Sequence, residues 1–170
     1  MKAFLFAGFA VLVASGALAQ AGAGGDAGGA PKTADFVAQA ASADMFEIEA
    51  GKLAARRADA PARAFAEEMV KDHRKTTQEL KALVAGGKVE ARIPQAMTAA
   101  QQAALAALKG LQGEDFTRQY LAGQAQAHEQ AVDLFARYGE GGDNAALKAW
   151  ASKTLPDLEE HLRMARNLAR

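Results

Sequence analysis

The chain has 170 residues, and its 20 basic and 20 acidic side chains give a formal net charge of zero at neutral pH. It has no block of basic residues, so we do not expect it to bind nucleic acid. It has no cysteine, which excludes disulfide bonds, thiol nucleophiles and lipid attachment at a signal-peptide cysteine.

The first 19 residues have the pattern of a secretory signal peptide. Lys2 precedes an apolar run, and small residues follow, ending in Ala17-Leu18-Ala19. This order matches a charged start, a hydrophobic segment and a cleavage site. The apolar run is shorter than the roughly 20 residues that a membrane-spanning helix needs. We therefore predict a periplasmic or secreted protein with no transmembrane span after cleavage; an anchor formed by an uncleaved N-terminal segment is the alternative.

The rest of the chain divides into a linker and one domain. Residues 20–32 are rich in glycine and alanine and contain no bulky apolar side chain, which predicts a flexible linker. Residues 33–170 have helical periodicity and lack the alternating β-branched runs and Asn-Gly turns that are typical of strands. We expect this part to fold as a single helical bundle domain.

Capping residues, glycines and prolines mark the predicted helix ends. The predicted helices are residues 33–59, 61–85, 98–111, 114–138 and 143–170, of which the last contains Pro156. Their predicted first residues or caps are Thr33 or Asp35, Pro61, Thr98, Glu114 and Asp143. Four helices are long and are joined by short connections, so neighbours should be antiparallel. The fold prediction is an all-α antiparallel four-helix bundle with one additional short helix.

The chain has only three histidines, one on each of three long predicted helices. On helical wheels His73 and His161 fall within the apolar faces of their helices, and His128 lies at the edge of one. His73 and His128 are also close to the midpoints of their helices, whereas His161 is about five residues beyond its midpoint, roughly 7 Å. We expect the three imidazoles to converge near the bundle centre.

Carboxylates accompany these histidines. Glu47 is at the midpoint of the first long helix, among small residues, and is the predicted fourth ligand. Asp72 and Asp157 are placed to orient the histidines through hydrogen bonds, as metal-bound imidazoles usually require. Imidazole with carboxylate suits zinc, copper, iron or nickel, so a transition metal is the predicted cofactor.

Other interpretations stay open. A core histidine can instead donate to a neighbouring carboxylate or carbonyl group, which would make the chain a structural or protein-interaction module. Di-iron carboxylate bundles use Glu-x-x-His, but Val70, Ala125 and Leu158 stand three residues before the histidines, which argues against that centre. No nucleophile elbow or P-loop is present, so an enzyme is the less favoured reading, and it would have to be metal-dependent.

Four blocks carry a resemblance to a known family: FVAQAASADMFEIEAGKLAARRA, FAEEMVKDH, FTRQYLAGQAQAHEQAVDLF and LKAWASKTLPDLEEHLRMA. Together they resemble bacterial exported proteins grouped as domain of unknown function 4142, often labelled membrane or outer-membrane proteins. The resemblance covers residues 34–168 and implies a ferritin-like helical bundle without an established activity. The motif positions that it implies are Glu47, Met69, Asp72, His73, His128, Pro156 and His161.

The combined prediction is an exported helical-bundle protein. It binds a metal ion through His73, His128, His161 and Glu47 in an envelope or stress-related role, and it is not expected to be an enzyme. The sequence does not identify a partner; the chain could form a homo-oligomer or bind an envelope protein.

Overall fold

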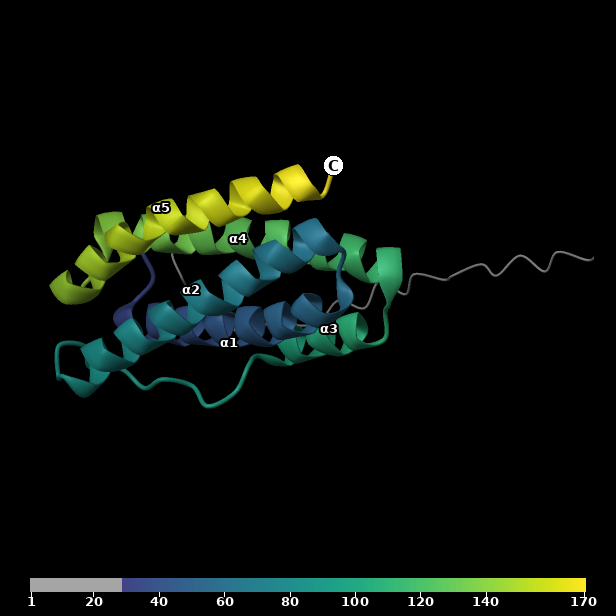
Figure 1. Cartoon of the computed structure of the whole chain (residues 1–170). Coiled ribbons are helices and arrows are strands. Elements are labelled where there is room, and N and C mark those ends of the chain that lie inside the picture. The colour runs from purple at the N-terminus through teal and green to yellow at the C-terminus, as the bar shows by residue number, and fades with distance from the viewer. Residues whose placement is uncertain (1–28) are drawn as a thin grey trace, which may run out of the picture.

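The computed structural model describes residues 29–170, which form five helices and no strand (Figure 1). The predicted signal peptide and most of the predicted linker lie outside these residues. The helices are α1 (Thr33–Arg57), α2 (Ala60–Ala85), α3 (Ala99–Lys109), α4 (Gly113–Gly141) and α5 (Ala145–Leu168). The prediction of four long helices and one short helix is confirmed.

The four long helices form a bundle in which α1 packs against α2 and α4, and α5 packs against α4 and α2. Two-residue and three-residue connections join α1 to α2 and α4 to α5, so each of these pairs is antiparallel. The short α3 lies beside α1 and α4 (Figure 1). The Arg57 guanidinium at the end of α1 donates to the carbonyl oxygens of Lys109 and Leu111, which ties α3 to the bundle.

One helix start follows the predicted chemistry, and another differs from it. Thr98 caps α3 with a capping box, in which its hydroxyl accepts from the backbone N–H of Gln101 and the Gln101 side chain accepts from the backbone N–H of Thr98. Asp59, predicted as the last residue of the first helix, instead caps α2 by accepting from the backbone N–H of Ala62. Pro61 is therefore the second residue of α2 and not its first.

Two predicted caps are wrong. Asn144, not Asp143, caps α5 by accepting from the backbone N–H of Leu147. The first helix is capped at Lys32 without a side-chain bond, because the Asp143 carboxylate reaches across from the α4–α5 connection and accepts from the backbone N–H and hydroxyl of Thr33 at 3.1 and 2.6 Å. A side chain from a distant part of the chain thus accepts the hydrogen bond at the start of α1 that a local capping residue was expected to accept.

Some helix ends also differ from prediction. The fourth helix continues past Tyr138 to Gly141, and the last helix stops at Leu168. The last helix passes through Pro156 without a break. None of the helices between residues 29 and 170 is both long and apolar enough to cross a membrane.

A layer of buried polar side chains divides the core in two. We call Asp44, Glu47, His73, Gln124, His128 and His161 the polar layer; each is at most 6% exposed. On one side of it lies an apolar cluster that includes Phe65, Met69, Phe116 and Tyr120. On the other side lies a cluster that includes Phe36, Leu80, Phe135, Tyr138 and Trp150. Every long helix crosses from one cluster to the other through this layer.

Candidate metal centre

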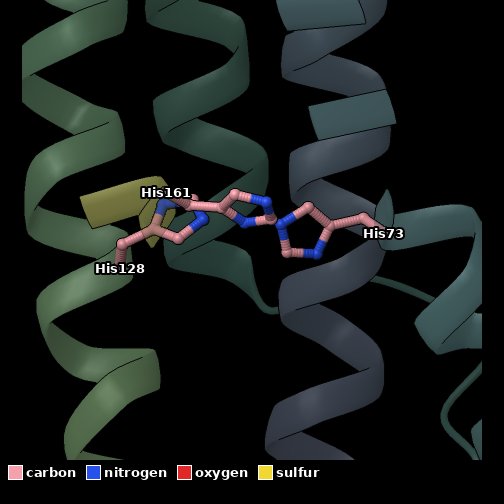
Figure 2. Close-up of side chains that lie close together, drawn as sticks. All are labelled: His73, His128 and His161. Carbon is pink, nitrogen blue, oxygen red and sulfur yellow. The ribbon is translucent and has the colours of Figure 1, made fainter. Parts of the chain in front are cut away.

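The three histidines meet in the polar layer, as the helical wheels predict (Figure 2). Their ring centroids are 5.6 Å apart for His73 and His128, 5.9 Å for His73 and His161, and 5.4 Å for His128 and His161. One ring nitrogen from each lies within 4.8 Å of the others. The position of His161 beyond the midpoint of its helix does not keep it out of the cluster.

One nitrogen of each ring is held by a hydrogen bond. His73 Nδ1 is 2.8 Å from a carboxylate oxygen of Asp44, and His128 Nδ1 is 2.9 Å from the backbone carbonyl oxygen of Gln124. His161 Nε2 is 3.3 Å from a carboxylate oxygen of Asp72. A carbonyl or carboxylate oxygen accepts, so the held nitrogen carries the proton when the ring is neutral.

The second nitrogen of each ring, His73 Nε2, His128 Nε2 and His161 Nδ1, is buried and has no hydrogen-bond partner within residues 29–170. A buried polar atom without a partner costs about 1–3 kcal/mol. In the neutral ring this nitrogen has a free lone pair, which is the form that binds a metal ion.

Asp44 is a residue of this site that the sequence analysis missed. Its carboxylate is buried and accepts hydrogen bonds from His73 Nδ1 and from the hydroxyl groups of Thr76 and Thr77. Asp44 therefore fixes the orientation of the His73 ring. The helical wheel contains the signal, because Asp44 is only about 60° from Glu47 on the same helix.

Glu47 is buried in the same layer, as expected, but its carboxylate is not in the group of converging ring nitrogens. It accepts a 2.5 Å hydrogen bond from the Gln124 side-chain amide. The structure leaves Glu47 beside the centre, and its role as a ligand stays a prediction. Tyr120, one turn before Gln124 on α4, presents a buried hydroxyl group that has no partner in the described part of the chain.

The two predicted orienting carboxylates are placed differently. Asp72 reaches from α2 to His161 on α5, and not to its neighbour His73. Asp157 lines a small pocket with Asp72 and His161, and its charge acts on the His161 ring. Glu68 and Asp72 also form a more exposed acidic group with His161.

Burial and neighbouring charges set different pKa values for the three histidines. Burial and the charge on His73 lower the pKa of His128 to about 3. The same two causes lower the pKa of His161, although Asp72 partly opposes them. Burial also disfavours the charged form of His73, but its hydrogen bond to Asp44 and the charges on Asp44 and Glu47 outweigh burial, so the pKa of His73 is raised. The lowered pKa values of His128 and His161 thus keep two of the three rings neutral.

The carboxyl group of Glu47 responds to the same environment. Burial raises its pKa, while the charge on His73 and the hydrogen bond from Gln124 oppose that rise. Burial, and then the charge on Glu47, likewise raise the pKa of Tyr120, which keeps the phenol neutral.

A pocket of about 320 Å³ opens onto the centre between α1, α3 and α4. Glu47, His73 and His128 form part of its wall, and Gln101, Gln119, Gln126 and Gln130 contribute amide side chains. On the opposite side, next to Asp72 and His161, the pocket measures only about 10 Å³. The centre is therefore open on one side and closed on the other.

The donor set fits a divalent transition-metal ion. Three imidazoles with a fourth position for solvent is a known arrangement at catalytic zinc sites, with metal–nitrogen distances of about 2.0–2.1 Å. Tetrahedral geometry would place the nitrogens about 3.3 Å apart, and the three ring nitrogens lie within 4.8 Å of one another. Asp44, the Gln124 carbonyl group and Asp72 supply the hydrogen bonds that orient metal-bound imidazoles.

Comparison with known proteins assigns the chain to a family. The family model of the domain of unknown function DUF4142 matches residues 18–168. The chain belongs to this family. The resemblance found in the sequence is thereby confirmed, and the three histidines and Glu47 all fall within the matched residues. No curated protein and no solved structure matches the chain.

Proposed function

We propose that this DUF4142 chain is an exported helical-bundle protein that binds a divalent transition-metal ion through His73, His128 and His161. One observation carries the proposal: each ring is held by one nitrogen and keeps its other nitrogen buried, unpartnered and close to those of the other two rings. Asp44 and Asp72 orient two of the ligands, and Glu47 lies beside the centre.

The alternative is a structural module with hydrogen-bonded core histidines. It accounts for only one of the two nitrogens of each imidazole ring. It explains the nitrogens that face Asp44, Gln124 and Asp72. It gives no reason for three unpartnered nitrogens to be gathered at one point in the core, where each of them is costly. A metal ion would satisfy all three.

The test is metal binding by a chain that begins at Gln20, after the predicted cleavage site. The protein is freed of metal with a chelator, and its melting temperature is then followed with zinc, copper, iron and nickel, each added alone. A ligand that binds only the folded state stabilises it, by about 2.7 kcal/mol at a hundredfold excess over Kd. We expect at least one ion to raise the melting temperature and to bind with a stoichiometry of one.

The matched variants are His73→Ala, His128→Ala and His161→Ala, which should each lose the increase. Glu49→Gln is the control, because Glu49 is a carboxylate of α1 that pairs with Lys52 at the surface. An ion that raises the melting temperatures of the wild type and of all three histidine variants equally would bind elsewhere. If no ion raises the melting temperature of the wild type, the proposal is wrong.

Export is part of the proposal and rests on the charged, apolar and small-residue order of the first 19 residues. Expression of the full chain in a Gram-negative bacterium, followed by fractionation and mass spectrometry, tests it. A periplasmic or secreted product that begins at Gln20 is expected. An intact N-terminus in the membrane fraction would support the uncleaved anchor instead, and an intact cytoplasmic product would contradict export.

A further inference from the structure

Five buried side-chain polar atoms have no hydrogen-bond partner within residues 29–170, and all five come from one region. Three are the histidine nitrogens of the metal centre, and the others are the hydroxyl group of Tyr120 and the side-chain oxygen of Gln124. The last two flank Glu47, since Gln124 donates to its carboxylate and the charge on Glu47 acts on Tyr120. A metal ion bound by three histidines would satisfy the nitrogens but neither of these oxygens.

The larger pocket is on the side of the centre where Glu47 lies. Its wall includes Glu47, His73 and His128, whereas His161 is at the closed side, where the pocket of about 10 Å³ has room for about one water molecule. The mouth is lined by Gln119, Gln126 and Gln130, which are exposed on α4. A ligand can therefore approach the centre along α4 and meet Glu47 beside the histidines.

We propose that the metal centre keeps one coordination position open toward this pocket, and that this position takes water, hydroxide or a small inorganic monoanion next to Glu47. The proposal rests on the metal site proposed above. Glu47, which lines the pocket and is held by the Gln124 amide, then lies beside the ligand and does not complete the coordination of the metal itself.

The residues that line the pocket limit the kind of ligand that can bind there. The pocket contains no lysine or arginine, and Glu47 is its one acidic side chain, so a multiply charged anion such as phosphate would meet a carboxylate and no long cationic side chain there. Its volume of about 320 Å³ is at the small end of ligand pockets. A small ligand with a nitrogen or oxygen donor atom fits these limits.

The experiment uses cobalt(II) as the metal and azide as the probe. Cobalt(II) bound by three imidazoles absorbs visible light, and the spectrum changes when an added anion joins the coordination sphere. The protein is loaded with cobalt(II) at equilibrium, and azide is then titrated. We expect a saturable spectral change in the wild type, with one azide per cobalt.

Gly123→Leu tests the direction of approach. Gly123 lines the pocket, and a Cβ at this position would meet no atom within 4 Å, so the larger side chain has room to enter the pocket without disturbing the helix. We expect azide affinity to fall about tenfold or more, equivalent to about 1.4 kcal/mol, while the cobalt spectrum without azide is kept. Ala104→Leu on α3 is a second variant that fills the pocket from the opposite wall. Ala149→Leu on α5, which lines a different pocket, is the matched control.

Glu47→Gln tests the place of the ligand. Loss of a carboxylate next to a bound anion removes repulsion, so azide should bind several-fold more tightly. Unchanged azide affinity in Glu47→Gln would show that Glu47 does not lie next to the bound ligand. Unchanged azide affinity in both pocket-filling variants would show that the ligand does not enter through this pocket. Cobalt that binds but never responds to azide would overturn the open position and leave the metal site standing. Failure to bind cobalt, zinc, copper, iron or nickel would overturn both proposals.

Discussion

Each histidine of the polar layer uses its two nitrogens for different purposes. The nitrogen that faces Asp44, the Gln124 carbonyl group or Asp72 fixes the ring, and the other nitrogen points into the cluster. A ring that is fixed in this way loses little conformational freedom when it binds an ion. If the proposed metal binds, the residue that orients the ring would therefore contribute to metal affinity without contacting the metal.

Asp44→Asn tests this contribution. The amide keeps the shape of the carboxylate but loses its charge, so His73 is less firmly oriented and is a weaker electron donor. Removing such a partner typically lowers metal affinity about 10–100-fold. Competition with a chromophoric chelator measures the affinity, and Asp133→Asn, at an exposed ion pair with Arg137, is the control. Equal affinities for Asp44→Asn and the wild type would contradict the orienting role.

The titration of the histidines predicts the pH dependence of the metal-free protein. Below pH 6.5 the unfolded chain protonates all three rings, but the folded protein resists protonation of His128 and His161, whose pKa values are lowered. Each proton that only the unfolded chain binds lowers the free energy of unfolding by about 1.4 kcal/mol per pH unit. The stability that neutral His128 and His161 permit is therefore present above pH 6.5 and is lost as the pH falls toward the lowered pKa values.

His73 and Glu47 act in the opposite sense, because their pKa values are raised. The contribution of His73 to the free energy of unfolding is complete below pH 6.5 and is lost as the pH rises through its raised pKa. The contribution of Glu47 is complete below pH 4.5 and is lost as the pH rises through the raised pKa of its carboxyl group. Urea unfolding with a chelator at about pH 6.5 and about pH 5 should show lower stability at the lower pH. His128→Gln should reduce this difference; equal stability at both pH values would contradict the prediction.

The sequence predicts the histidines of the site better than it predicts their partners. Three histidines on or beside apolar faces, two of them near their helix midpoints, can be identified from the numbering, and the structure brings all three together. Asp44 was missed because an acidic residue is assumed to be solvated unless its position on the wheel is examined. The pairing of Asp72 with His161 could not be predicted, since it depends on how α2 and α5 are rotated against each other.

At the scale of the helices, close approach depends on two glycines. A Cβ on Gly51 of α1 would lie 2.7 Å from a methyl group of Val70 on α2, and a Cβ on Gly139 of α4 would lie 2.8 Å from the Ser152 hydroxyl on α5. Both positions belong to the tightly packed helix pairs α1–α2 and α4–α5. Any side chain there must move a neighbour.

Gly51→Ala and Gly123→Ala make the same change in two environments. Alanine favours a helix over glycine by about 1 kcal/mol, and at Gly123 nothing opposes this gain. At Gly51 the clash with Val70 and a contact of 3.1 Å with the Ala66 carbonyl oxygen should cost about 1–3 kcal/mol. Thermal unfolding should show a higher melting temperature for Gly123→Ala and a lower one for Gly51→Ala. The same increase for both would show that α1 and α2 can separate at little cost.

Helix number and length could be predicted, but some caps could not. The capping box at Thr98 is a local pattern, and the structure has it. Asp143 has the residue type of a cap next to α5, yet it binds Thr33 at the start of α1, while Asn144 takes the local role. Two adjacent residues were equally suited to cap α5, and only the packing of α1 against the end of α4 decides between them.

At the scale of the whole molecule, the polar layer interrupts what would otherwise be a continuous apolar core. The two clusters on either side contain the large aromatic residues, and the layer between them contains buried groups without partners. Such a layer costs stability in the absence of a ligand. The fold therefore contains a region that interrupts apolar packing, and the proposed metal ion would offset part of that cost.

The double variant His128→Leu/His161→Leu tests this cost. Leucine has a similar size, needs no hydrogen bond, and leaves Asp72 partly exposed to water. We expect the metal-free protein to gain about 1–3 kcal/mol of stability in urea unfolding and to lose metal binding. His73→Leu is the contrasting variant, and it should destabilise because it leaves the Asp44 carboxylate buried without its imidazole. A double variant less stable than the wild type would contradict the prediction.

The three histidines come from α2, α4 and α5, and the residues that orient them come from α1, α2 and α4. The site is therefore complete only when all four long helices are docked, and contacts of this kind form late in folding. An ion held there could do little to speed folding, because the transition state would not yet contain its ligands. It would instead slow the reverse step, since the helices cannot separate before the ion is released. For a chain without disulfide bonds, bound metal would thus act on the lifetime of the folded state and on its resistance to proteases.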